Sequence, residues 1–158
     1  MMKIGITGHQ NLPESSVPFI SEEIKTVLAS VEEELIGISS LAVGADQLFA
    51  EIILNADKRL QVVVPCNDYE NTFSNISDLE RYRYFINKAD FIEKLKFGKP
   101  SEEAFLQAGM KIVDLSNILI AIWDGLKPNG KGGTADIVEY AKSMKKKVHI
   151  IWPEDTIR

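Results

Sequence analysis

The fold is decided by residues 118–139, which read ILIAIWDGLKPNGKGGTADIVE. The apolar run at 118–123 has the character of a buried strand, and it leads through a glycine-rich loop into an amphipathic helix pattern over 134–145. Glycines let a backbone approach a ligand closely, and the unpaired amides at a helix start attract an anion. This segment therefore predicts a place for the phosphate of a nucleotide or sugar phosphate.

Short apolar runs alternate with amphipathic stretches along the rest of the chain, which is typical of a parallel sheet covered by helices on both faces. The predicted strands are residues 3–7, 37–42, 60–64, 91–95, 117–123 and 148–152. The predicted helices lie near 17–35, 46–56, 77–89, 102–115 and 134–145. We therefore predict one α/β domain over residues 1–158, a Rossmann-like three-layer sandwich with a mostly parallel sheet of about six strands.

Composition restricts the partners and the compartment. A chain of 158 residues with 45% hydrophobic content can bury a core of its own. The formal net charge of −5 predicts no broad nucleic-acid binding, because such binding needs a basic surface. Cys66 is the only cysteine, and neither a secretory signal nor a run long enough to cross a bilayer is visible. We expect a cytoplasmic protein without a membrane partner.

Four polar or glycine-bearing loops follow predicted strands, at residues 7–11, 43–46, 65–69 and 124–134. In an open parallel sheet, ligands bind in a crevice at the carboxyl ends of the strands. We therefore expect one ligand-binding cleft, built by Thr7, Gly8, His9, Gly44, Ala45, Asp46, Pro65, Gly125, Gly130, Gly132, Gly133 and Thr134.

Several of these residues have two interpretations each. Thr134 caps the last helix or donates its hydroxyl to phosphate, beside the close approach made by Gly132 and Gly133. His9 lies near a phosphate or is an exposed histidine in a turn. Asp46 is the N-cap of the second helix, or faces the cleft and accepts hydrogen bonds from ribose hydroxyls. Because a complete G-x-G-x-x-G fingerprint is absent, an NAD-dependent oxidoreductase is disfavoured.

The aromatic and arginine-containing segment 68–84 follows the third predicted strand. It can fold over the cleft, with Tyr69 stacking on a base and Arg81 or Arg83 pairing with phosphate. Alternatively it is a helix in which Tyr82 and Phe85 pack while the arginines stay in water. No residues have metal-ligand spacing, so we expect no metal and no required cofactor other than a nucleotide ligand.

Three carboxylates are candidates for catalysis, namely Asp124, Asp136 and Glu139. Asp136 and Glu139 are three residues apart on one helix face, where they can bind ribose or assist cleavage of a glycosidic bond. The alternative is a solvated acidic helix start that the helix dipole stabilises. Asp124 stands at the end of a predicted strand, which makes it the strongest of the three.

Residues 5–9, 41–50 and 122–135 together resemble the SLOG superfamily over nearly the full chain. This superfamily contains Rossmann-like proteins related to DNA-processing protein A, to the cytokinin-activating Lonely Guy enzymes and to molybdenum-cofactor carriers. The resemblance implies that a nucleotide or nucleotide-derived ligand binds in the cleft, with the protein acting as a sensor or carrier. Relatives are often dimers, so a homodimer is one assembly that it implies.

The resemblance also implies an enzymatic alternative, because some relatives cleave a nucleoside monophosphate at its N-glycosidic bond. The Lonely Guy enzymes carry a Pro-Gly-Gly-x-Gly-Thr-x-x-Glu loop, and here Glu139 is displaced relative to Thr134. Gln10 stands where close relatives often have arginine. The Gly-Thr-Ala segment also resembles nucleoside deoxyribosyltransferases. The alternative function is thus an N-glycosidase or glycosyltransferase acting on nucleoside monophosphates.

Overall fold

A computed structural model of the chain describes residues 1–127 and 133–157. In these residues one sheet contains six strands, all parallel, in the order β4-β3-β2-β1-β5-β6. The strands are β1 (Met2–Gly8), β2 (Leu35–Ser39), β3 (Arg59–Cys66), β4 (Phe91–Phe97), β5 (Ile118–Ile122) and β6 (Lys147–Ile151). The Rossmann-like α/β fold is confirmed, and the sheet is entirely rather than mostly parallel.

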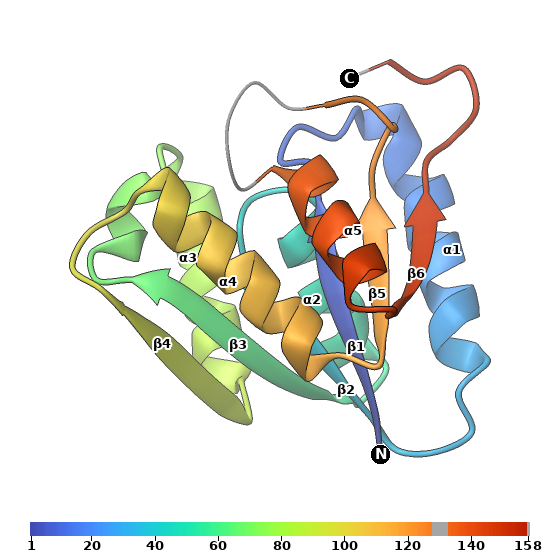
Figure 1. Ribbon diagram of the computed structural model, residues 1–158, viewed down its shortest axis with the longest axis horizontal. Coiled ribbons are helices and arrows are strands. Elements are labelled where there is room, and N and C mark those ends of the chain that lie inside the picture. The colour runs from blue at the N-terminus through green and yellow to red at the C-terminus, as the bar shows by residue number, and fades with distance from the viewer. Residues whose placement is uncertain (128–132, 158) are drawn as a thin grey trace.

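Helices cover both faces of the sheet (Figure 1). They are α1 (Val17–Ala29), α2 (Ala45–Asn55), α3 (Ile76–Lys88), α4 (Glu102–Leu115) and α5 (Thr134–Ser143). Ile24 of α1, Phe49 of α2 and Phe85 of α3 share one buried apolar cluster with the sheet. Ile112 of α4 and Ile137 of α5 belong to a second cluster on the opposite face. The three layers of the predicted sandwich are therefore present.

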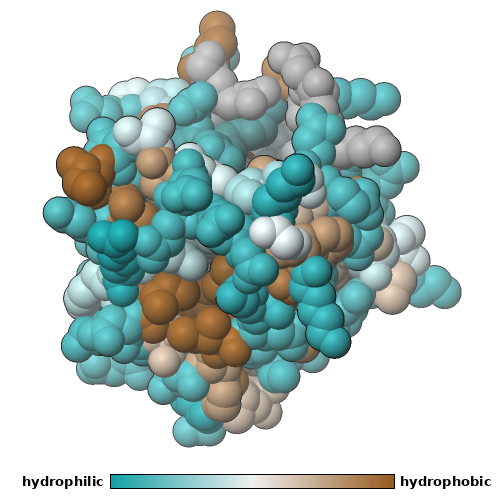
Figure 2. Space-filling view, turned by 90° about the vertical axis from the view of Figure 1, so that its left-hand side faces the viewer, coloured by the Kyte–Doolittle hydropathy of each residue, from teal (hydrophilic) through white to brown (hydrophobic). Residues whose placement is uncertain are grey.

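The weakest predicted strand, at residues 91–95, is confirmed as the edge strand β4. Its position explains its charged residues, because charges on an edge strand discourage pairing with another chain. Figure 2 faces the side on which β4 lies and shows an apolar patch surrounded by hydrophilic residues. Phe91 and Ile92 of β4 are both exposed.

Several predicted boundaries differ from the structure, chiefly those of the first helix and of the second and third strands. The first helix ends at Ala29 rather than near residue 35, and β2 begins at Leu35. The three glutamates at 32–34 are unfavourable at a helix C-terminus, and Leu35 pairs with Met2 in the sheet. Strand β3 runs through Pro65 to Cys66, although we predicted that Pro65 would stop it. The pairing of β3 with β4 shifts register between Val64 and Cys66, which accommodates a residue without an amide hydrogen.

The strand order positions the site. The chain builds β2, β3 and β4 on one side of β1, then crosses through α4 to place β5 on the other side. The order therefore reverses at β1, and ligands bind at the carboxyl ends of strands beside such a reversal. Among the described residues, no helix has the length and apolar character needed to span a membrane.

Candidate ligand-binding cleft

A cleft of about 720 Å³ lies at the carboxyl ends of the strands. Loops after β1, β2 and β3 line it together with the starts of α4 and α5. Of the predicted binding residues, the following line the cleft: Thr7, Gly8, His9, Asp46, Pro65, Gly133 and Thr134. Loops distant in sequence therefore do converge on one cleft.

Other predicted residues are not brought into the lining of this cleft. Among the described residues these are Gly44, Ala45, Arg81, Asp124, Gly125, Asp136 and Glu139. The predicted Gly130 and Gly132 lie outside the residues that the structure describes. The segment predicted to bind phosphate is thus represented in the lining by Leu126, by its last glycine, Gly133, and by Thr134.

Gly8, Gly44 and Ala45 join the loops after β1 and β2. A Cβ added to Gly8 would lie 2.5 Å from the Cβ of Ala45, so only glycine allows this approach. Gly44 has a φ of 89°, and an added Cβ would lie 2.4 Å from the carbonyl oxygen of Gln10. The Ala45 amide donates to the carbonyl of His9 at 3.1 Å. Gly44 and Ala45 therefore shape the cleft through packing.

Asp46 faces the cleft but is not the helix N-cap, so that prediction is wrong. The N-cap of α2 is Gly44, and Asp46 lies in the first turn. Its Oδ2 accepts a hydrogen bond from the Ala42 amide at 3.2 Å, so the carboxyl folds back onto the preceding loop. Asp46 is 8% exposed, and burial raises its pKa from 3.8 to about 7. The cleft thus contains a carboxyl group that titrates near neutral pH.

His9 is buried rather than exposed, which excludes the simple turn histidine. Its Nε2 accepts a hydrogen bond from the Asp124 amide at 3.1 Å and lies 3.1 Å from Asp124 Oδ1. The same carboxylate oxygen accepts from the Leu126 amide at 3.0 Å. The His9 ring also meets Trp152 edge-on, with centroids 5.3 Å apart. His9 therefore fastens the end of β1 to the residues that follow β5.

None of the three predicted catalytic carboxylates lines the cleft. The Asp124 side chain is held beside His9 and is 8% exposed. Asp136 is partly buried in the first turn of α5, and Glu139 is exposed on the same helix. Among the described cleft residues, Asp46 is the one acidic side chain.

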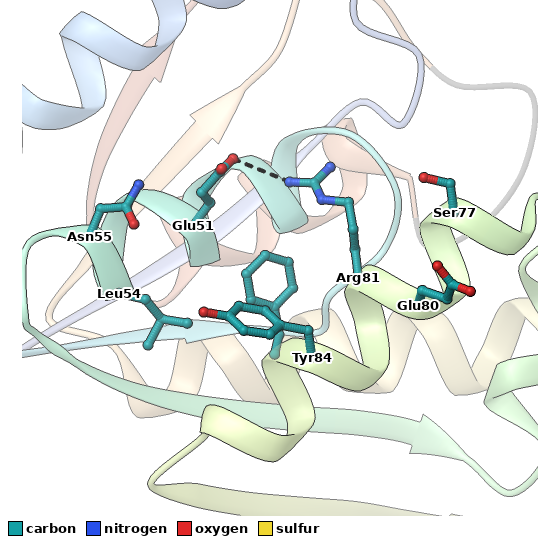
Figure 3. A pocket seen from close by; sticks show the side chains of 8 residues that line it. Glu51, Leu54, Asn55, Ser77, Glu80, Arg81 and Tyr84 are labelled. Carbon is teal, nitrogen blue, oxygen red and sulfur yellow. Dashed lines mark hydrogen bonds and ion pairs between the residues drawn. The ribbon is translucent and has the colours of Figure 1, made fainter.

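Arg81 lies in a separate groove between α2 and α3 (Figure 3). Its Nη2 is 3.2 Å from Glu51 Oε2, and its guanidinium lies 5.7 Å from the centre of the Phe85 ring. Tyr82 and Phe85 are buried, as the alternative interpretation of this helix predicted. Their inward orientation turns Arg81 toward α2 instead of the cleft.

Tyr69 is a buried residue at the cleft wall rather than a free stacking platform. Its hydroxyl donates to the Ser40 carbonyl at 3.0 Å. Its ring packs at steep angles against Phe73 and Tyr82, with centroids 5.5 Å away in each case. These contacts fix the loop after β3 against the loop after β2.

Sequence reasoning missed several lining residues, chiefly Ser40, Phe73, Ser101 and Phe105. Ser40 Oγ is buried and has no hydrogen-bond partner among the described residues. Ser101 caps α4, since its hydroxyl oxygen accepts from the Ala104 amide at 3.0 Å. The cap was a usable signal, because a serine before a helix at the end of a strand places the helix start at this edge.

The described lining contains backbone amides and hydroxyl groups, which are groups that can bind an anion. None of its described lining residues is lysine or arginine. Thr134 is the first residue of α5, so Gly133 rather than Thr134 is the N-cap, and no side chain in the described part of the chain caps this helix. The described residues contain no group of histidine, cysteine and acidic side chains that could hold a metal ion.

No protein-family model and no curated protein matches this sequence. Solved structures do match its fold. DNA processing protein A from Streptococcus pneumoniae matches with a TM-score of 0.71 at 18% identity, over 98% of this chain and 51% of that one. This chain therefore spans about half the length of that protein. TM1055 matches with a TM-score of 0.61 at 16% identity, over 94% of this chain and 72% of that chain.

A third match corrects our expectation about partners. DNA processing protein A from Helicobacter pylori, described with a single-stranded DNA binding mode, matches with a TM-score of 0.72 at 16% identity, over 98% of this chain and 67% of that one. This match contradicts our expectation of no broad nucleic-acid binding. That expectation failed because net charge is a sum over the whole chain, whereas a nucleic-acid strand is bound by local groups. The chain shares the fold of DNA processing protein A, as its resemblance to the SLOG superfamily implies.

Proposed function

We propose that the cleft binds a nucleotide or nucleotide-derived ligand, with its phosphate at the start of α5. The observation that carries this proposal is the start of a ten-residue helix that opens into the cleft, where no side chain of the described residues caps it. Helix starts bind phosphate through free amides and the positive end of the dipole. Gly133 and Thr134 line the cleft there, and the Thr134 side chain is buried.

The rest of the lining suits a sugar and a base. Thr7, Ser40 and Asp46 supply polar groups, and Phe73 and Phe105 supply apolar surface. A few polar groups in a largely preformed apolar cleft are typical of small-molecule sites. We propose the role of sensor or carrier first, because Asp124, Asp136 and Glu139 stand outside this lining.

Two variants of Gly133 test the proposal. Gly133 has φ −72° and ψ 171°, so other residues adopt its backbone conformation. Asp and Asn are both good N-caps, so both variants should keep or raise the melting temperature of the free protein. Only Gly133→Asp adds a negative charge at the phosphate position.

We expect nucleoside mono-, di- or triphosphates to raise the melting temperature of the wild type and of Gly133→Asn. Gly133→Asp should lose this increase. Equal nucleotide-induced stabilisation in Gly133→Asp and Gly133→Asn would contradict the phosphate position, and an absence of stabilisation in the wild type would contradict nucleotide binding.

Single-stranded DNA is a second candidate ligand, favoured by the fold shared with the Helicobacter pylori protein. Fluorescence anisotropy of a labelled oligothymidine measures this binding directly. Competition by free nucleotide would place both ligands in the same cleft. Unchanged anisotropy at high protein concentration would argue against the DNA candidate.

The enzymatic alternative is an N-glycosidase or glycosyltransferase acting on nucleoside monophosphates. The carboxyl that lines the cleft is Asp46, and its raised pKa suits a group that gives a proton to a leaving base. Chromatography of nucleoside monophosphates after incubation with the protein tests this alternative. Binding without release of free base would reject it.

A further inference from the structure

We infer that Ser40 and Asp46 form a subsite for the vicinal hydroxyls of a ribose, so that the cleft selects ribonucleotides over 2′-deoxyribonucleotides. This inference rests on the proposed nucleotide function and adds the class of sugar. It depends on two residues that line one cleft from the loop after β2 and the first turn of α2.

Ser40 supplies the first observation. Ser40 lines the cleft and is 9% exposed as a residue, yet its buried Oγ has no hydrogen-bond partner among the described residues. The backbone around it is fixed, because the Ser40 carbonyl accepts from the Tyr69 hydroxyl at 3.0 Å. Buried hydroxyls in native proteins nearly always have a partner. A ligand group in the cleft is therefore a natural partner for Ser40.

Among the described residues, the other buried side-chain atom without a hydrogen-bond partner is Gln47 Oε1, and its surroundings differ from those of Ser40 Oγ. Gln47 Oε1 belongs to a side chain that is held from its opposite end, where Nε2 donates to the carbonyls of Leu41 and Asp78. Gln47 does not line the cleft. Of these two residues with an unpartnered buried atom, Ser40 is thus the one that lines the cleft.

Asp46 supplies the second observation. Its Oδ2 accepts from the Ala42 amide, and a carboxylate has acceptor sites for further donors. Burial disfavours the charged form of Asp46, so the pKa is raised to about 7. A ligand hydroxyl that donates to the carboxylate would favour its charged form. Serine can donate and accept, and a diol offers both complementary groups.

The order of the strands places a sugar here rather than a phosphate. Along the sheet edge, β5 leads to the start of α5, β2 leads to Ser40, and β3 leads to Tyr69 and Phe73. With phosphate at α5 and the base near Phe73, the sugar of a nucleotide falls between them. Ser40 and Asp46 follow β2, which lies between β1 and β3 in the sheet.

Isothermal titration calorimetry tests the inference with matched pairs: adenosine and deoxyadenosine monophosphate, and uridine and deoxyuridine monophosphate. We expect the wild type to bind each ribonucleotide about tenfold or more tightly than its deoxy partner, because a site built for a hydroxyl rejects the analogue that lacks it. Ser40→Ala and Asp46→Asn should reduce the ratio to about twofold or less. The surface variant Asp57→Asn should keep the wild-type ratio.

The melting temperature of Ser40→Ala separates this inference from a purely structural role for Ser40. On this inference, Ser40→Ala removes a hydroxyl that has no partner in the described part of the chain, so the melting temperature should stay the same or rise while ribose selectivity falls. A lower melting temperature with unchanged selectivity would overturn the inference. Tight binding of both members of each pair would also overturn it and leave the proposed nucleotide function intact. No binding of any of the four nucleotides would overturn the proposed function itself.

Discussion

Replacing Asp46 with asparagine should stabilise the protein at alkaline pH and have little effect in acid. The pKa of Asp46 rises from 3.8 to about 7 because the side chain is buried. The folded state therefore binds this proton more tightly than the unfolded state. Stability contributed by Asp46 is complete below about pH 4, falls as the pH rises through about 7, and is constant above that.

The size of the effect follows from the same values. At about 1.36 kcal/mol per pKa unit, burial of the charged form costs about 4 kcal/mol. Asparagine is neutral at every pH, and its carbonyl oxygen can still accept from the Ala42 amide. Asp46→Asn should thus match the wild type near about pH 4 and exceed it by up to about 4 kcal/mol near about pH 8. For a chain of this size that is roughly 8–16 °C in melting temperature.

Urea denaturation followed by tryptophan fluorescence measures the free energy of unfolding of both proteins from acid to alkaline pH. The difference between variant and wild type cancels the titration of other groups. Asp57→Asn, which changes an exposed carboxylate, should show no such pH-dependent gap. A gap that is the same in acid and base, or an Asp46→Asn variant that is less stable near about pH 8, would refute the assignment of a buried charge at Asp46.

Three further substitutions have expected outcomes. Gly8→Ala should lower the free energy of unfolding by about 1–3 kcal/mol, because its Cβ would lie 2.5 Å from the Cβ of Ala45. Gly98→Ala should be neutral, since no atom lies within 4 Å of an added Cβ. Urea denaturation measures both variants. Ser101→Ala should cost about 0.5–2 kcal/mol through loss of the α4 cap, and Asn75→Ala, which removes the α3 cap, should cost a similar amount in the same assay. Arg81→Ala should leave nucleotide affinity unchanged in calorimetry. It should change the free energy of unfolding by less than about 1 kcal/mol, because the ion pair of Arg81 with Glu51 is exposed. A marked loss of affinity would instead show that Arg81 contacts the nucleotide.

The fold could be predicted because buried apolar residues recur along the sequence with the period of the helix or strand that contains them. Strand β5 is apolar along its length because it lies between two strands and under helices on both faces. Helix α4 carries apolar residues at helical spacing, and its predicted bounds match the structure. The break between α1 and β2 was harder, because Leu35 continues the apolar pattern of the helix while pairing in the sheet. Local periodicity cannot separate these two outcomes.

The site was predictable only where loop position decides it. Thr7 at the end of β1, His9 after β1 and Asp46 at the start of α2 reach the cleft because parallel strands end at one edge. Asp124 also follows a strand, but its carboxylate contacts His9, a residue that is far away in sequence. Arg81 is turned away by the packing of its neighbours in α3. Such orientations depend on three-dimensional neighbours that no local pattern contains.

The chemistry of the lining restricts what kind of anion the cleft can hold. Its described residues include Asp46 and no lysine or arginine, so a phosphate bound here would be attracted by helix amides, dipoles and hydroxyls. Such groups act over about one turn of helix, so they suit one phosphate group better than a row of them. A single strand of DNA bound here would insert one nucleotide and would need cations outside this lining for its other phosphates. Nucleotide and DNA binding would then share the start of α5, and Gly133→Asp would weaken both.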